Sequence, residues 1–160
     1  MIILSFLVGV IAGLRALTPL AVISWAAYLG GLQLQDTWLA FLGHAATAYI
    51  SSALALGELV NDKLPKTPSR KLPMPFAARI VVGALCGAAL GTHASAALET
   101  YAGAAVLGAF AGAVGAVVGT LGGAALRARL AGAFGKDLPA ALPEDAVAIG
   151  GAVLIVSRFV

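Results

Sequence analysis

The stretch Gly13-Leu14-Arg15-Ala16-Leu17-Thr18-Pro19 interrupts an otherwise uncharged run from Met1 to Leu34. A continuous helix over that run would measure about 51 Å at 1.5 Å per residue, well beyond a hydrocarbon core of about 30 Å. Thr18 and Pro19 indicate a break, because a Thr hydroxyl can cap a new helix and Pro suits its first position. We therefore predict two half-helices, residues 2–13 and 19–29, with Arg15 at their junction.

The composition is that of a membrane protein. Of the 160 residues, 61% are hydrophobic and 11% are charged, whereas soluble domains average about 25% charged residues. The pattern predicts an all-α fold, a polytopic transmembrane helical bundle of about five spans in a single domain, residues 1–160. The predicted spans are 2–29 (broken), 38–60, 76–91, 101–126 and 143–157. No basic start precedes the first span, so we expect no removable signal peptide.

The basic residues predict the orientation of the chain in the membrane. Residues 61–75 hold four Lys or Arg residues and residues 127–142 hold three, whereas residues 30–37 and 92–100 hold none. Because Lys and Arg concentrate in cytoplasmic loops, we predict a multi-pass protein of the cell membrane with a cytoplasmic N-terminus. The net charge of +3 then favours anionic lipid rather than nucleic acid as a partner. The candidate lipid-headgroup residues are Lys63, Lys66, Arg70 and Lys71.

Glycines recur at helical spacing on the third and fourth predicted spans. Gly83, Gly87 and Gly91 are four residues apart, and the fourth span carries glycines three or four residues apart. Small residues let transmembrane helices approach closely, so we predict that the fourth span is the central helix of the bundle. A phosphate-binding loop is excluded, because no strand precedes these glycines and no Lys follows them.

Five further charged residues are predicted in the cytoplasmic third of the bundle: Glu58, Asp62, Arg79, Glu144 and Asp145. Arg15 lies about 21 Å of helix from Met1, and a charge at mid-membrane depth needs a partner. We predict one ion pair between Glu58 and Arg79 and another between Arg15 and either Glu144 or Asp145. An alternative reason for the last two acids is the helix dipole, if Pro143 begins the last span.

Four carboxylates against two arginines leave negative charge in excess, which indicates a bound cation or a proton. Conversely, a helix start at Thr18 beside Arg15 can receive an anion such as a lipid phosphate. The sequence therefore leaves the polarity of a substrate open. The candidate substrate- or ion-binding residues are Arg15, Thr18, Glu58, Asp62, Arg79, Glu144 and Asp145.

Several of these residues lie in motifs of a known family. The chain resembles the bacterial membrane-protein family called domain of unknown function 4126 in Gly13-Leu14-Arg15 with Pro19, Glu58-Leu59-Val60-Asn61-Asp62-Lys63-Leu64-Pro65 continuing to Thr67-Pro68-Ser69-Arg70, Ala78-Arg79-Ile80 and Glu144-Asp145. The resemblance covers nearly the whole chain, and the acidic-Lys-Pro block is its most specific part. It implies a small protein of the bacterial inner membrane and directs attention to the charged residues, including Lys63, without assigning an activity.

Three functions fit this pattern. The first is a small transporter or channel, in which Arg15 binds or gates while Glu58 and Asp145 carry protons or a cation, or in which the site takes a lipid-phosphate solute. The second is a structural or assembly protein with closed salt bridges. The third is a lipid-headgroup enzyme with a divalent metal on Asp62, Glu144 and Asp145.

The enzyme is the weakest of the three, because these acids form no recognisable metal motif and no nucleophile motif is present. We therefore predict no catalytic residue and no cofactor, and leave a metal site open. His44 and His93 lie on different spans, where we expect interfacial or backbone-bonded roles. The expected partners are the lipid bilayer, a second copy in a homodimer, and a small ion or lipid headgroup.

Overall fold

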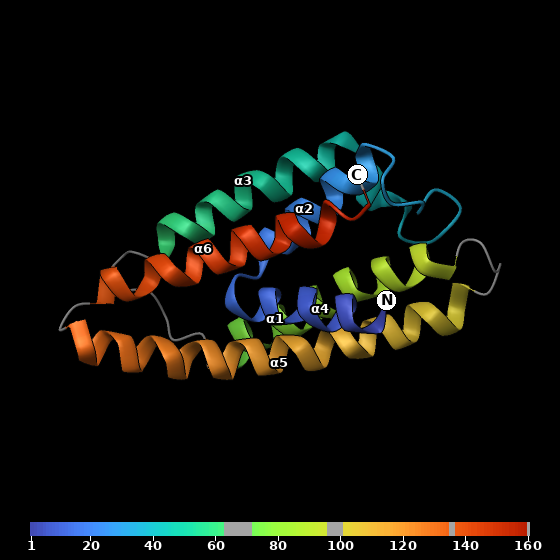
Figure 1. The fold of residues 1–160 in the computed structure, drawn as a ribbon. Helices are drawn as coiled ribbons and strands as arrows, with labels where there is room; N and C mark the ends of the chain where they lie inside the picture. Colours follow the sequence, from blue (N-terminus) through green and yellow to red (C-terminus); the bar gives the residue numbers. More distant parts are fainter. Residues whose placement is uncertain (63–71, 96–100, 135–136, 160) are drawn as a thin grey trace.

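The apolar runs form helices in the computed structural model, which describes residues 1–62, 72–95, 101–134 and 137–159. The elements in chain order are α1 (Ile2–Leu14), α2 (Leu17–Tyr28), the short 3-10 helix η1 (Ala40–Gly43), α3 (Ala45–Asn61), α4 (Pro73–Ser95), α5 (Tyr101–Phe134) and α6 (Asp137–Val156) (Figure 1). No strand occurs in these described ranges, so the predicted all-α fold is confirmed. The candidate headgroup residues Lys63, Lys66, Arg70 and Lys71 lie outside them.

The predicted break in the first apolar run is confirmed. α1 ends at Leu14, Arg15 is extended with φ −139° and ψ 108°, and α2 begins at Leu17. The break does not, however, divide one continuous span. α2 returns toward the end of the bundle from which α1 came, so that the two helices form a hairpin (Figure 1).

Contacts with neighbouring helices support this reversal. α1 runs antiparallel to α4, because Ser5 near its start bonds the carbonyl of Gly87 and Arg79, earlier on α4, reaches its end. α2 runs antiparallel to α3, because Trp25 near its end bonds Ser52, while the start of α2 meets Glu58 farther along α3.

Both chain termini and the segment between α2 and α3 therefore lie at one end of the bundle, as Figure 1 shows. α3 and α5 end, and α4 and α6 begin, toward the other end. This arrangement differs from the predicted order, in which the N-terminus shares a side with the basic connections after α3 and α5. The difference arises because the hairpin takes the place of the predicted first span.

Several predicted helix boundaries differ from the structure. Before α3, His44 is extended and the chain from Trp38 forms turns and η1, so the second helix is shorter than predicted. α4 begins at Pro73, because prolines are tolerated in a first turn that needs no backbone N–H donors. Arg127 and Arg129 belong to α5 rather than to a loop.

α6 begins at Asp137 and contains Pro143 in its interior. Glu144 and Asp145 therefore lie about two turns inside the helix. The helix dipole acts mainly on the first turn, so it does not account for these acids as the sequence alternative supposed.

Glycines hold α4 and α5 together, as predicted, and those of α1 join the same interface, which was not predicted. α5 packs against α1, α4 and α6. A Cβ atom added to Gly87 would lie under 3.0 Å from the carbonyl oxygen of Gly108, and one added to Gly112 equally close to that of Gly83. Gly9 of α1 meets Gly112 in the same way. Backbone therefore packs directly on backbone, and we call α1, α4 and α5 the glycine-packed group.

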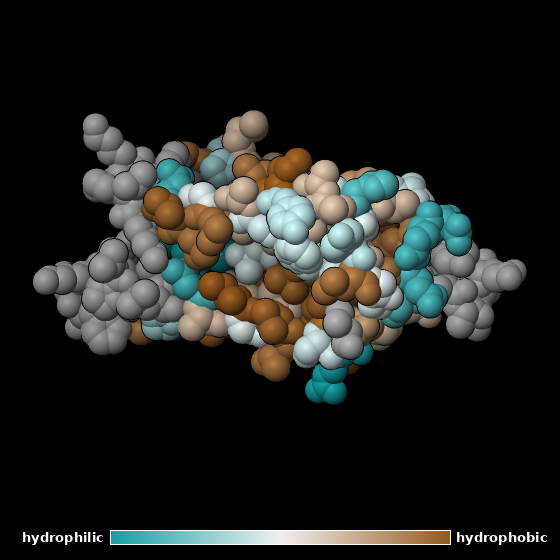
Figure 2. All heavy atoms as spheres, turned by 90° about the horizontal axis from the view of Figure 1, so that it is seen from above, coloured by the Kyte–Doolittle hydropathy of each residue, from teal (hydrophilic) through white to brown (hydrophobic). Residues whose placement is uncertain are grey.

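The surface has the character expected of a protein in lipid. Two helical stretches, Pro73–Ala94 and Gly103–Leu130, are long and apolar enough to cross a membrane. Large apolar side chains face outward, among them Phe110 at 70% and Leu154 at 69% exposure. On the face that Figure 2 shows, the most hydrophilic described residues lie toward the two ends and at the lower edge, and the middle holds apolar and nearly neutral residues.

His93 helps to close the end that carries the termini. Its Nδ1 accepts a hydrogen bond from the backbone N–H of Gln33 at 3.0 Å, and its ring packs edge-on against Phe159. The predicted backbone-bonded role of this histidine is thus confirmed.

Candidate functional site

Arg15 lies between α1 and α2 with none of its surface exposed. Its Nε donates to Oδ1 of Asp145 at 2.9 Å, and its Nη2 donates to the same oxygen. Its Nη1 donates to Oδ2 of Asp62 at 2.6 Å. The buried guanidinium therefore joins α6 and the end of α3 through two carboxylates. The predicted pair with Asp145 is confirmed, whereas the bond to Asp62 was not predicted.

Glu58 provides the cap at the start of α2. Its two carboxylate oxygens accept the backbone N–H groups of Ala16 and Leu17, each at 2.9 Å. These are N–H groups that a helix cannot satisfy internally, and a carboxylate there also meets the positive end of the dipole. The predicted cap, Thr18, is wrong: its hydroxyl is buried with no partner among the described residues, because the remote Glu58 already occupies the position.

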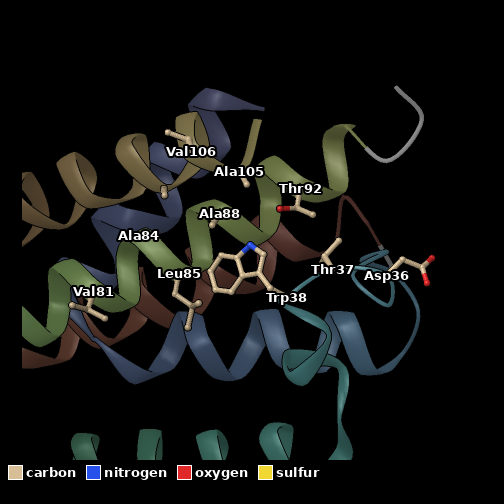
Figure 3. A pocket seen from close by; sticks show the side chains of 11 residues that line it. Asp36, Thr37, Trp38, Val81, Ala84, Leu85, Ala88, Thr92, Ala105 and Val106 are labelled. Carbon is tan, nitrogen blue, oxygen red and sulfur yellow. The ribbon is translucent and has the colours of Figure 1, made fainter. Parts of the chain in front are cut away.

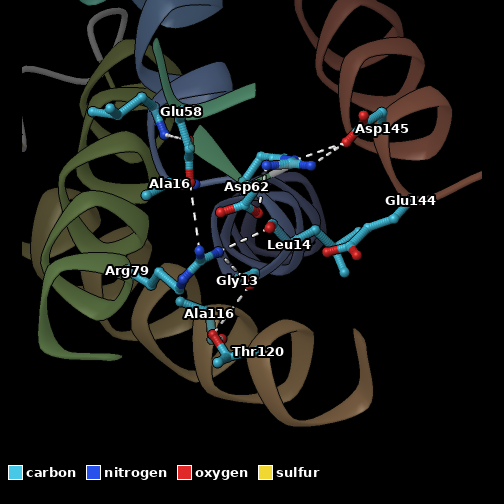
Figure 4. A network of polar contacts seen from close by, with 12 residues as sticks. Gly13, Leu14, Ala16, Glu58, Asp62, Arg79, Ala116, Thr120, Glu144 and Asp145 are labelled. Atoms are coloured by element: carbon cyan, nitrogen blue, oxygen red, sulfur yellow. Dashed lines mark hydrogen bonds and ion pairs between the residues drawn. The ribbon is translucent and has the colours of Figure 1, made fainter. Parts of the chain in front are cut away.

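Arg79 caps the end of α1, where the last backbone carbonyl groups have no partner within the helix. Its Nη1 donates to the carbonyl oxygens of Gly13 at 3.0 Å and Leu14 at 2.8 Å, and Thr120 also donates to Gly13. Its Nη2 lies 3.5 Å from Oε1 of Glu58, which confirms the predicted pair. Figure 4 shows Arg79 between the two helix ends.

Arg127 is a third arginine of the site that the sequence reasoning missed. Its Nη1 lies 3.8 Å from Oε2 of Glu144 and 4.0 Å from Oδ2 of Asp62. The predicted fourth span ends at residue 126, whereas α5 continues to Phe134 and includes Arg127. The available signal was its place directly after the apolar run, where one more helical turn brings it level with the acids.

The ion pairs join two groups of helices that carry opposite charges. The arginines belong to the glycine-packed group, with Arg15 directly after α1, Arg79 on α4 and Arg127 on α5. The carboxylates belong to α6 and to the end of α3, and α6 itself packs against α1, α2 and α5. Within the described residues the cluster holds three arginines and the four carboxylates Glu58, Asp62, Glu144 and Asp145. Among the described residues the carboxylates therefore outnumber the arginines by one, whereas the sequence predicted an excess of two.

Six of the seven predicted ion-binding residues lie together in the charged cluster. The seventh is Thr18, whose hydroxyl has no hydrogen-bond partner among the described residues. Arg15 was expected deeper than the other charges, yet they occupy one layer because α1 is short and the helix ends meet there. No group of three His, Cys, Asp or Glu side chains within the described ranges is arranged to hold a metal ion. The postulated metal set of Asp62, Glu144 and Asp145 instead faces arginine.

The cap formed by Glu58 is open to a direct test. Replacing Glu58 with Gln leaves one acceptor oxygen for two backbone N–H groups and removes the charge facing Arg79. We expect the free energy of unfolding in detergent to fall by about 1–3 kcal/mol, the cost of leaving a buried polar group unsatisfied. Asp36→Asn is the control, since Asp36 is exposed and outside the cluster. Equal stability of the two variants would contradict the cap.

Comparisons with known proteins agree with the resemblance seen in the motifs. Neither the curated proteins nor the solved structures gave a match. The family model described as domain of unknown function (DUF4126) matches residues 2–158. This match covers the glycine-packed group and the whole charged cluster, and the chain belongs to that family.

Proposed function

We propose that the protein is a small membrane transporter or channel for protons or a small cation, and that the charged cluster is its gate in the closed state. The observation that carries the proposal is Arg15, which is fully buried at a helix break and bound by carboxylates from two other helices. Short helices that meet at a charged site inside a membrane are a recurring arrangement in transporters.

Stability alone does not account for this cluster. A buried ion pair costs several kcal/mol of desolvation per ion, and apolar replacements are often neutral or stabilising. The glycine-packed group already holds three helices together without any charge. Because ionisable residues in membrane segments mark ion pathways by default, the buried arginines and acids support a function beyond folding.

The geometry favours a cation or proton over a lipid phosphate. The start of α2, where an anion was an open alternative, is filled by the carboxylate of Glu58. An anion would have to displace that carboxylate while facing three more. A proton or cation on Asp62 or Asp145 would instead weaken the hold on Arg15, and the end of α3 or the start of α6 could then move away from Arg15.

The proposed orientation follows from the hairpin. α1 and α2 have 13 and 12 residues and measure about 20 and 18 Å, less than a hydrocarbon core of about 30 Å. We infer that they enter the membrane and return to the same side, while α3 to α6 cross it. If the basic connections are cytoplasmic, both termini lie on the opposite side.

A structural or assembly role is the second candidate. The observation in its favour is the complete burial of Arg15 between two carboxylates, which is also what a permanent salt bridge requires. A homodimer remains part of both proposals.

Flux measurements separate the two candidates. We expect purified protein in liposomes to dissipate an imposed proton, Na⁺ or K⁺ gradient, and Asp145→Asn, which resembles the protonated carboxyl and weakens the hold on Arg15, to raise the flux above that of the wild type. Asp36→Asn should retain the wild-type flux. Circular dichroism of each variant controls for folding. An Asp145→Asn flux no higher than that of the wild type would contradict the gate, and wild-type protein inactive under all three gradients would favour the structural role.

A further inference from the structure

A second feature, lined by residues other than those of the charged cluster, is a large apolar groove along α4 and α5. It has a volume of about 780 Å³ and reaches from Val81 to Thr92 on α4. Alanines such as Ala88 and Ala105 line it, and their small side chains leave the space unfilled. Trp38, from the segment before η1, lies against it with 66% of its surface exposed (Figure 3).

Water is a poor occupant for this groove. A volume of 780 Å³ corresponds to about 26 water molecules at 30 Å³ each, and each water needs two to four polar partners. The lining is alanine, valine and leucine apart from Asp36, Thr37, Thr92 and the indole of Trp38, which all belong to one end. An empty groove would forfeit the dispersion contacts of its walls.

The groove matches one lipid chain in length and position. From Thr92 to Val81 it follows about 16 Å of helix at 1.5 Å per residue, and half of a hydrocarbon core of about 30 Å is about 15 Å. It follows the two helices that are long and apolar enough to span a membrane. Its polar end carries Trp38, and tryptophan is the residue typical of the membrane interface.

A second copy of the chain fits this groove less well. A helix with its side chains is about 10–12 Å across, and Trp38 lines the groove together with the alanines (Figure 3), so a helix would compete with the indole for the same space. A single hydrocarbon chain is thinner than a helix and needs less room beside the indole.

We propose that this groove binds one acyl chain of a phospholipid, with the headgroup at the Asp36 to Trp38 end and the chain running along α4 toward Val81. The site depends on the proposed membrane location but not on transport. It is formed by residues that take no part in the charged cluster.

Trp38 itself reports on occupancy. The chain has two tryptophans, so Trp25→Phe leaves Trp38 as the only indole. We expect titration of this variant in detergent with phosphatidylcholine brominated on its acyl chains to quench Trp38 emission, saturating at equimolar lipid. Bromine near the carbonyl end should quench more strongly than bromine near the chain terminus, because Trp38 lies at the headgroup end.

Ala109→Phe provides the matched test, because Ala109 lines the groove, whereas Ala113, one turn farther along α5, does not. Both alanines are half-buried. Saturable quenching should disappear in Ala109→Phe and persist in Ala113→Phe. Quenching that rises without saturation, or that has no dependence on bromine position, would overturn the proposal. A dimer that Ala109→Phe converts to monomer would assign the groove to a second copy instead, whatever the outcome of the flux measurements.

Discussion

Asp145→Ala is expected to lower the free energy of unfolding by about 3–5 kcal/mol, because it removes one partner of a buried ion pair and leaves the other. In this variant Nε and Nη2 of Arg15 lose their acceptor, and no surface of the side chain is exposed to water. Only the bond to Asp62 remains of its two carboxylate contacts. Unfolding in detergent, followed by circular dichroism against a denaturing surfactant, measures the loss, with Asp36→Ala as the exposed acidic control.

The double variant Arg15→Met with Asp145→Leu shows whether the loss of stability comes from leaving the buried charge of Arg15 without its partner. We expect its stability to return to within about 1 kcal/mol of the wild type, since apolar replacements of a buried pair are often neutral. Asp62 keeps a neighbour in Arg127 at 4.0 Å. A double variant as unstable as Asp145→Ala would contradict the pair and indicate lost packing at Asp145. If the double variant is stable but its flux differs from that of the wild type, the charges act in gating rather than in folding.

The helices and the ion pair between Glu58 and Arg79 were predictable from the sequence because their determinants are local or directly adjacent to a connection. The break at Arg15 follows from a length that no bilayer accommodates. Glu58 and Arg79 flank one connection, so a pair between them is the simplest arrangement. Glycine spacing likewise indicated which helices pack, because it depends only on the helical period.

The direction of α2 was not predictable in the same way. A break near Thr18 permits both a continued span and a reversal, and the choice depends on which neighbours the two helices find. The reversal is stabilised by remote groups: Glu58 caps α2 and Arg79 caps α1. Composition around the break contains neither residue, so the predicted Thr18 cap was the best local guess and was wrong.

Gly112→Leu is expected to abolish the packing of the glycine-packed group. A Cβ atom on Gly112 would meet backbone atoms of Gly83 and Gly87 on α4 at about 3 Å or less, and Gly9 of α1 approaches the same residue. Backbone cannot rotate away as a side chain can, so the helices must separate. Overpacking by extra methylenes costs about 1–3 kcal/mol and occasionally more. Because two interfaces are affected, we expect a loss at or above that upper value.

Gly122→Ala is the matched control on the same helix, since nothing lies within 4 Å of a Cβ atom at Gly122. Alanine there removes the entropic cost of glycine in a helix and should raise stability by about 0.5–1 kcal/mol. The same measurement of unfolding in detergent compares the two variants. Opposite signs are required if close backbone approach, rather than a general need for glycine in α5, holds α1, α4 and α5 together. Equal destabilisation of the two variants would mean that α5 needs glycine for its own conformation. Close backbone packing would then not explain how α1, α4 and α5 are held together.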